Sequence, residues 1–224
     1  MAFDNLLNEL ETRRAKALAM GGAEKLAKRR AAGFLNARER IDALFDAGTF
    51  MESGLFATSV HPQDAEKSPA DGKIAGFGQI RGREAAVVAN DFTVMGASSA
   101  AINMKKIGHM KRTAASKGIP LILLGESSGA RLPDNMGARG MGTLLGQDPQ
   151  QYLRCRESPW VSAALGLCYG SSTWYCVLAD FNVMRKGAII AVSSSLLASL
   201  AMNDNVEAEE LGGWRVHAEI TGFA

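Results

Sequence analysis

The residues best placed for chemistry lie in a turn that follows a short apolar run. Leu121–Leu124 has the pattern of a strand, and Gly125–Arg131 after it reads GESSGAR. Small residues let a ligand approach the backbone closely, and a turn between a strand and a helix leaves main-chain amides free to bind an anion. This turn is therefore a candidate oxyanion site.

A second turn of the same kind lies further along the chain. Gly166–Ser172 reads GLCYGSS and precedes a helix-like run from Trp174 to Ala179. One such turn would mean little, but two turns can each supply one amide to a shared oxyanion. The pair predicts an enzyme that uses its backbone to stabilise negative charge on a carbonyl oxygen.

The first turn has an alternative interpretation, as the nucleophile elbow of a serine hydrolase. Gly125–Gly129 matches the pattern GxSxG, with Ser127 as the nucleophile. Such an elbow requires a histidine base that a carboxylate orients. The histidines of the chain are His61 in an expected loop, His109 in an expected helix, and His217. The residues alone leave this alternative open.

The elements that must position these turns follow from hydrophobic spacing and from chain breakers. Lys73–Ile80 and Ala85–Ala89 predict a hairpin with its turn at Arg81 and Gly82. Pro120–Gly125 is a continuous apolar run, which is typical of a strand buried on both faces. The other expected elements are helices at Phe3–Lys28 with a break at Gly21 and Gly22, Asn36–Gly48 and Ser98–Ser116, strands at Ala163–Leu167 and Gly187–Val192, and an exposed loop at Pro62–Pro69. Strands alternating with helices predict an α/β domain.

Composition argues against several classes of protein. The 224 residues are 47% hydrophobic, and 25 basic against 23 acidic residues leave a net charge of +2, which favours neither nucleic acid nor membrane as a partner. Cys155, Cys168 and Cys176 form no CxxC pair, so we expect no disulfide framework and no metal site. No segment approaches the roughly 20 apolar residues of a spanning helix, and no signal peptide is recognisable. A cytoplasmic protein is expected.

Four runs of sequence resemble one known family, in the same order along the chain. They are DGKIAGFG at Asp71–Gly78, NDFTVMGAS at Asn90–Ser98, ESSGARLP at Glu126–Pro133 and EELGGWRVH at Glu209–His217. Together with the stretch Arg13–Phe50, they resemble the N-terminal domain of biotin-dependent acyl-CoA carboxylase β subunits, which are carboxyltransferases. The resemblance covers nearly the whole chain, and it is more specific to the family than to the substrate.

The resemblance implies a fold and a reaction. The family has the crotonase-like (ClpP/crotonase) fold, an α/β architecture built as a β-β-α spiral superhelix, here with an N-terminal helical arm. Its reaction transfers a carboxyl group from carboxybiotin to the α-carbon of an acyl-CoA, through an enolate that backbone amides stabilise. In this mechanism the ureido nitrogen of biotin takes the α-proton, so no protein side chain has to act as the base.

The same resemblance assigns residues to the site. Gly129 and Ala130 match the glycine and alanine of the family's first turn, and Gly170 with Ser171 occupies the place of a Gly-Gly pair in the second turn. These four positions are the expected catalytic amides. The residues expected to contact the coenzyme A thioester are Ser128, Arg131, Gly96, Ala97, Ser98 and Tyr169.

Some positions depart from the family pattern. The family usually has glycine where Ser128 and Ser171 stand, so the amides remain while the conformational freedom of both turns falls. Tyr169, Trp174 and Tyr175 replace smaller residues, which indicates either a remodelled acyl pocket or core packing. The cations near the turns in sequence, available for coenzyme A phosphates but expected mostly at the solvated surface, are Arg131, Lys105, Lys106, Lys111 and Arg112.

The resemblance also implies partners and a division of the chain. Residues 1–50 are expected to form the helical arm, and residues 51–224 the carboxyltransferase domain. Expected partners are acyl-CoA, a biotin carrier protein or domain, a C-terminal half or partner subunit that binds biotin, and biotin carboxylase, in an oligomer. Three alternatives remain open: a biotin-dependent acyl-CoA decarboxylase, the serine hydrolase, and a non-catalytic scaffold whose Ser128 and Ser171 weaken the oxyanion hole.

Overall fold

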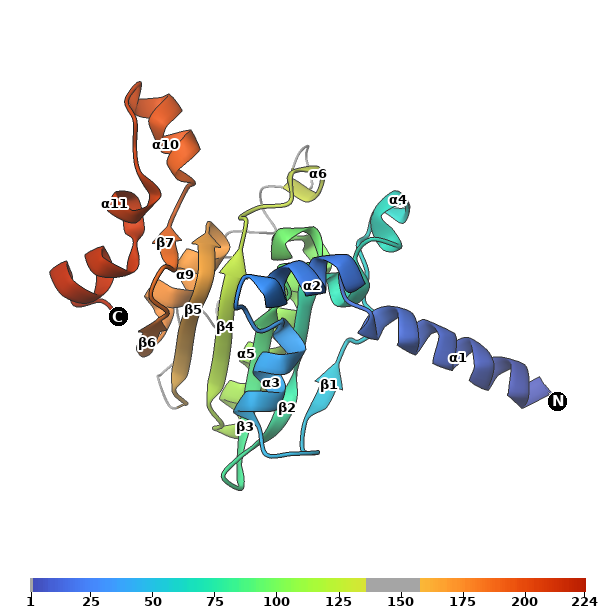
Figure 1. Ribbon diagram of the computed structural model, residues 1–224. Helices are drawn as coiled ribbons and strands as arrows, with labels where there is room; N and C mark the ends of the chain where they lie inside the picture. Colours follow the sequence, from blue (N-terminus) through green and yellow to red (C-terminus); the bar gives the residue numbers. More distant parts are fainter. Residues whose placement is uncertain (1, 136–157) are drawn as a thin grey trace.

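The computed structural model of the chain describes residues 2–135 and 158–224. Within these residues one mixed sheet has the strand order β1-β2-β3-β4-β5-β6, with β7 paired to β5 (Figure 1). The first three strands are antiparallel neighbours, and all later pairings are parallel. The strands are β1 (Met51–Ser53), β2 (Lys73–Ile80), β3 (Arg83–Asn90), β4 (Leu121–Ser127), β5 (Trp160–Tyr169), β6 (Phe181–Met184) and β7 (Ile189–Ala191).

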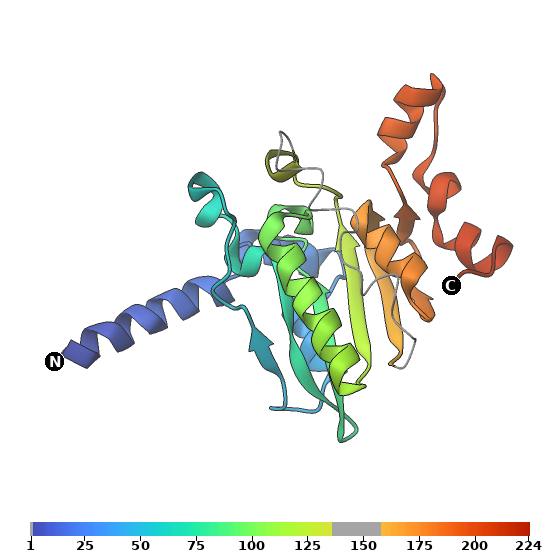
Figure 2. The same cartoon turned by 180° about the vertical axis from the view of Figure 1, so that it is seen from behind.

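Helices cover both faces of the sheet. Figure 1 shows α2 and α3 in front of it, and Figure 2 shows α5 and α9 on the opposite face. The helices are α1 (Ala2–Leu18), α2 (Ala23–Ala31), α3 (Ala37–Leu44), α4 (Pro62–Ala65), α5 (Ala101–Lys117), α6 (Leu132–Asn135), α9 (Ser171–Leu178), α10 (Ser195–Met202) and α11 (Ala208–Gly212). Two short 3₁₀ turns, η1 (Pro69–Gly72) and η2 (Met95–Ala97), and one π-helical turn, η3 (Val216–Ile220), complete the described elements.

Strand β4 lies at the centre of the core and is covered on both faces. Leu121 and Leu123 pack with Ile107 and other residues of α5 on one face. Leu124 packs with Ile41 of α3 on the other face. This double burial explains the continuous apolar run, as predicted. Because β4 and β5 are parallel, their carboxyl ends lie at the same edge of the sheet, the upper edge in Figure 1.

Local signals in the sequence explain why these elements begin and end where they do. The side chain of Asn36 accepts hydrogen bonds from the amides of Arg38 and Glu39, and the Glu39 carboxylate accepts one from Asn36, which forms a capping box at the start of α3. Arg81 and Gly82 both have positive φ, 51° and 75°, as the predicted two-residue hairpin turn requires. The predicted helix start and hairpin are confirmed.

Some elements differ from the prediction. Pro62–Pro69 was expected to be an exposed loop, but it contains α4, because Pro62 at the first helical position has a φ suited to a helix. Ser68 in this segment is buried, and its hydroxyl accepts a hydrogen bond from the Ser59 amide at 2.8 Å. Strands β1 and β6 were not predicted, since both are short, and β6 pairs only with β5 among the described strands.

The ends of the described chain extend away from the sheet. Helix α1 projects from the body in Figure 1, with Phe3, Leu6 and Leu7 exposed. The predicted break between α1 and α2 at Gly21 and Gly22 is confirmed. No helix in the described ranges is long and apolar enough to cross a membrane. The proposed domain boundary at residue 50 stays a prediction, and α3 before it shares a hydrophobic cluster with β2 and β3 after it.

Candidate active site

The two turns predicted from the sequence meet at the carboxyl ends of β4 and β5. A Cβ atom built on Gly170 would lie 3.4 Å from the Cα atom of Gly129 and 4.0 Å from the amide nitrogen of Ala130. Both glycines have positive φ, 104° at Gly129 and 62° at Gly170, a backbone region that favours glycine. The convergence of the two turns, which we call the first bend (residues 128–130) and the second bend (residues 170–171), is therefore confirmed.

One free amide lies on each bend. The Ser128 amide donates to Gly96 O at 2.9 Å, and the Gly170 amide donates to Val192 O at 3.2 Å. Within residues 2–135 and 158–224, the amides of Ala130 and Ser171 donate no hydrogen bond. Ser171 is the first residue of α9, where a helix cannot satisfy its own N–H groups. Two donors from adjacent bends are the arrangement that an oxyanion hole needs, while their catalytic role stays a prediction.

The η2 turn is hydrogen-bonded to the segment that carries the first bend. The carbonyl oxygen of Ala97 accepts hydrogen bonds from Lys73 Nζ at 2.6 Å and from Ser127 Oγ at 3.1 Å. A Cβ atom on Gly96, which has a φ of 61°, would lie 2.6 Å from Ser128 Oγ. Gly96 and Ala97 therefore hold the bend in place. Their contact with the coenzyme stays a prediction.

Arg131 is held inside the protein beside the first bend. Its Nη1 atom lies 2.6 Å from Asp71 Oδ1, and its side chain is 3% exposed. Its Nε atom donates to Ser98 Oγ at 3.2 Å, while the other Asp71 oxygen accepts from the Asn103 amide at 2.9 Å. Burial raises the pKa of Asp71, and the ion pair with Arg131 opposes this shift. Arg131 is therefore held by Asp71 and Ser98, and the contact of Arg131 and Ser98 with coenzyme A stays a prediction.

The prediction for two of the lysines was wrong. Lys106 and Lys111 were expected at the solvated surface but are buried, because both lie on the face of α5 that packs on the sheet. The Lys106 ammonium donates to three main-chain carbonyl oxygens. Burial lowers the pKa of Lys106 to about 8 and that of Lys73 to about 7. Lys105 and Arg112 are exposed.

The three aromatic residues that depart from the family pattern lie in different environments. Tyr175 belongs to the core, with its hydroxyl 3.1 Å from Met104 Sδ and its ring 4.9 Å from Lys111 Nζ. Trp174 is 42% exposed. Tyr169 lies at the bends, with its Cβ atom 3.9 Å from a Cβ built on Gly129, and burial raises its pKa. Tyr169 is therefore the one of the three whose side chain starts beside the first bend.

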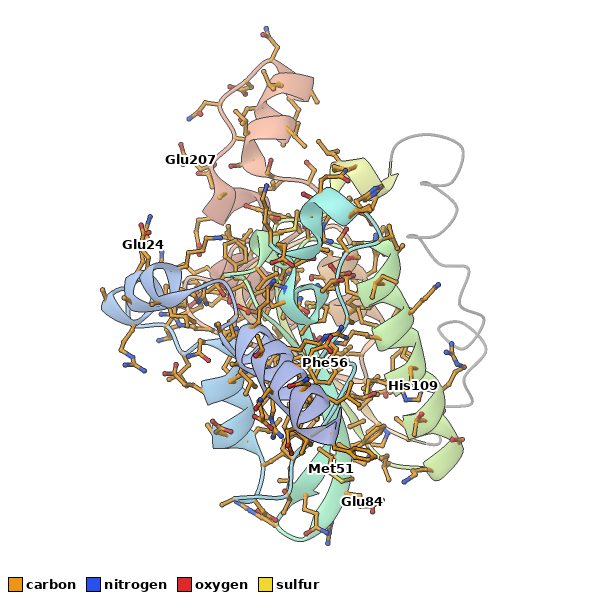
Figure 3. All side chains as sticks on the ribbon, turned by 90° about the vertical axis from the view of Figure 1, so that its right-hand side faces the viewer. Glu24, Met51, Phe56, Glu84, His109 and Glu207 are labelled. Atoms are coloured by element: carbon orange, nitrogen blue, oxygen red, sulfur yellow. The ribbon has the colours of Figure 1, made fainter. Side chains whose placement is uncertain are left out.

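The geometry gives Ser127 a structural role instead of a nucleophilic one. Its side chain is fully buried, and its hydroxyl bonds the main chain of the neighbouring segments. His109 is exposed on α5 (Figure 3), and His217 Nε2 lies 3.0 Å from Ile190 O. His61 lies 3.8 Å from Asp134 Oδ2. In the part of the chain that the structure describes, no histidine bonds Ser127, so a hydrolase elbow is not assembled.

The sequence did not reveal two residues that connect the bends. The Ser99 amide donates to Gly129 O at 2.8 Å, its carbonyl accepts from the Arg131 amide at 2.9 Å, and its hydroxyl bonds that of Ser171. Glu126, at the end of β4, forms a buried ion pair with Arg29 and Arg40. Glu126 stands at the start of the motif Glu126–Pro133, but nothing in the sequence indicated its arginine partners, and Ser99 had no signal beyond its place after the Asn90–Ser98 motif.

The domain has a crotonase-like fold. Its defining features are the hairpin, the parallel strands with their connecting helices, and the two strand-to-helix bends that meet with free amides. No group of His, Cys, Asp and Glu side chains among the described residues could hold a metal ion. Cys155, which the sequence prediction included, lies outside these residues.

The chain belongs to the carboxyl transferase domain family, whose sequence profile matches residues 28–224. It is 32% identical over 226 residues to the propionyl-CoA carboxylase beta chain of Roseobacter denitrificans, a match that covers 98% of this chain and 44% of that protein. It is 33% identical over 225 residues to the mitochondrial propionyl-CoA carboxylase beta chain of Sus scrofa, covering 96% of this chain and 41% of that one. The resemblance seen in the sequence motifs is therefore confirmed.

Solved structures agree with this assignment. The chain superimposes on transcarboxylase 12S, a hexameric assembly with methylmalonyl-coenzyme A and methylmalonic acid bound, with a TM-score of 0.85 and 28% identity. The match covers 98% of this chain and 43% of that chain. The chain spans less than half the length of these three relatives.

Proposed function

We propose that the chain forms the acyl-CoA-binding half of a biotin-dependent carboxyltransferase. The observation that carries this proposal is the pair of free amides at Ala130 and Ser171, on two bends so close that a Cβ atom on Gly170 would touch Gly129. An acyl-CoA loses its α-proton only with difficulty, because negative charge develops on the thioester oxygen. Fixed amide dipoles aimed at that oxygen stabilise the enolate in a site that excludes water.

The residues of the chain then take distinct roles. Ala130 N–H and Ser171 N–H donate to the thioester oxygen, and these hydrogen bonds strengthen as charge accumulates there. Gly129 and Gly170 let the two backbones approach each other. Ser128 and Tyr169 line the approach to the oxyanion, with Tyr169 reshaping the acyl end of the pocket. Carboxybiotin, when its carrier presents it, supplies the carboxyl group.

The partners follow from the relatives. The two curated relatives are named for propionyl-CoA, and the transcarboxylase structure holds methylmalonyl-coenzyme A, which supports a CoA thioester as the substrate. Because the chain spans less than half of these proteins, we propose that a C-terminal half or partner subunit supplies the biotin site, with a biotin carrier and biotin carboxylase, in an oligomer. The free, buried Cys168 and Cys176 support a reducing, cytoplasmic compartment.

A binding and turnover experiment tests this proposal. The purified chain is titrated with acyl-CoAs by calorimetry and then assayed for acyl-CoA carboxylation from labelled bicarbonate, alone and with the complex that co-purifies from its source. We expect the chain alone to bind acyl-CoA without turnover, and the assembled complex to carboxylate. Full activity of the isolated chain would contradict the proposal that a C-terminal half or partner subunit supplies the biotin site. Binding of acyl-CoA without activity in the complex would favour a non-catalytic scaffold.

A further inference from the structure

A buried cluster of charged side chains lies beside β4 and β5, the strands that lead into the two bends. Glu126 is the residue before Ser127 at the end of β4, and its side chain is 5% exposed. Its carboxylate accepts two hydrogen bonds from Arg29 of α2, at 2.9 and 2.7 Å, and lies 2.8 Å from Nη2 of Arg40 in α3. A bidentate pair fixes the orientation of a carboxylate more tightly than a single contact does.

The two arginines are themselves held in place. The Arg29 guanidinium lies over the rings of Phe34 and Phe92, with 5.1 and 5.7 Å to the ring centroids. Arg40 is 7% exposed in its side chain, and Glu126 favours its charged form, against the effect of burial, which lowers its pKa. Both cations therefore depend on one carboxylate, and that carboxylate is attached to the strand that ends in the first bend.

Glu126 also reaches the strand that ends in the second bend. A Cβ atom built on Gly166 of β5 would lie 2.6 Å from Glu126 Oε1. Gly166 lies where the register between the strands shifts, since Gly125 pairs with Ala164 but Ser127 pairs with Cys168. The Glu126 side chain fills this irregularity. The carboxylate therefore lies against β5 at a point four residues before Gly170 of the second bend.

We propose that Glu126 is a positioning residue that sets the spacing between the amides of Ala130 and Ser171. Arg29 and Arg40 orient it, so the helices α2 and α3 control the geometry of a site that they do not enter. The inference rests on the proposed carboxyltransferase function. Because catalysis depends on sub-ångström placement of the oxyanion donors, a small displacement of either bend lowers turnover before it weakens substrate binding.

The substitution Glu126→Gln tests this role, because it keeps the shape of the side chain and removes its charge. We expect kcat in the assembled complex to fall about tenfold or more, with KM for acyl-CoA changed less than about threefold, since the displaced donors act mainly on the transition state. Glu126→Asp keeps the charge but withdraws the carboxylate from Gly166, and we expect an intermediate kcat.

The matched control is Glu52→Gln. Glu52 of β1 forms an equivalent bidentate pair with Arg38 of α3, at 2.8 and 3.3 Å, on a strand separated from β4 by β2 and β3. We expect this variant to lose some thermal stability, less than Glu126→Gln because only one arginine loses its partner, while it keeps kcat within about twofold, because its ion pair touches neither bend.

Several results would overturn the inference. One is a folded Glu126→Gln protein with kcat within threefold of wild type, and another is a KM that rises in proportion to the loss of kcat/KM. If both Glu126 variants fail to fold while Glu52→Gln folds, Glu126 serves stability alone and the inference also fails. A wild-type complex without carboxyltransferase activity would instead refute the proposed function, so the two failures are distinguishable.

Discussion

The most direct test of the oxyanion hole removes one amide hydrogen without disturbing the helix that carries it. Ser171 is the first residue of α9, and proline is tolerated at that position because the N–H there has no helical partner. The preceding residue, Gly170, has φ 62° and ψ −119°, the mirror image of an extended conformation, which a following proline accepts. The substitution Ser171→Pro should therefore remove the catalytic donor and leave the fold intact.

The size of the effect follows from these features. Loss of one oxyanion donor lowers kcat by about 10²–10³, equivalent to about 3–4 kcal/mol in the transition state. The substitution also removes the hydroxyl contact with Ser99, which contributes about 1 kcal/mol to stability. Ser171→Ala removes the same hydroxyl and keeps the amide, so it is the matched control. We expect it to retain kcat within a few-fold of wild type.

The assay compares kcat and KM for acyl-CoA in the assembled complex, together with thermal denaturation of both variants. We expect Ser171→Pro to lose at least a hundredfold in kcat relative to Ser171→Ala, with comparable melting temperatures. A folded proline variant whose kcat is within threefold of the alanine variant would show that this amide does not hold the oxyanion, and the reasoning from the two bends would fail.

Two further predictions concern the backbone contact and the buried lysine. Gly170→Ala places a Cβ atom 3.4 Å from Gly129 Cα at a φ of 62°. We expect about 1–3 kcal/mol of backbone strain, measured by urea denaturation, and at least a tenfold lower kcat. Wild-type stability and wild-type turnover would contradict the close approach of the two bends. Burial lowers the pKa of Lys73 from 10.5 to about 7. The unfolded chain therefore binds more protons at Lys73 between these values, so the contribution of Lys73 to the free energy of unfolding is lowest below pH 7 and rises toward pH 10. Lys73→Met should remove up to about 4 kcal/mol of this rise, and equal pH slopes in urea denaturation of both proteins would refute the assignment.

Local features of the fold could be predicted from the sequence because they depend on residues close together in the chain. The hairpin turn at Arg81 and Gly82 needs only two residues that accept positive φ. The start of α3 needs only Asn36 and Glu39 three positions apart. The two glycine-containing bends are also local, and small residues after an apolar strand were sufficient to locate them.

The sequence by itself thus determined where the bends and most of the secondary structure lie, and its motifs identified the family. Only the tertiary structure decided which amides are free, because the partners of Ser128 and Gly170 are carbonyl oxygens from other segments. It also decided the burial of Lys106 and the role of Glu126, whose arginine partners come from distant helices. Such contacts join residues far apart in the chain, and the local spacing of residues does not predict which distant segments meet when the chain folds.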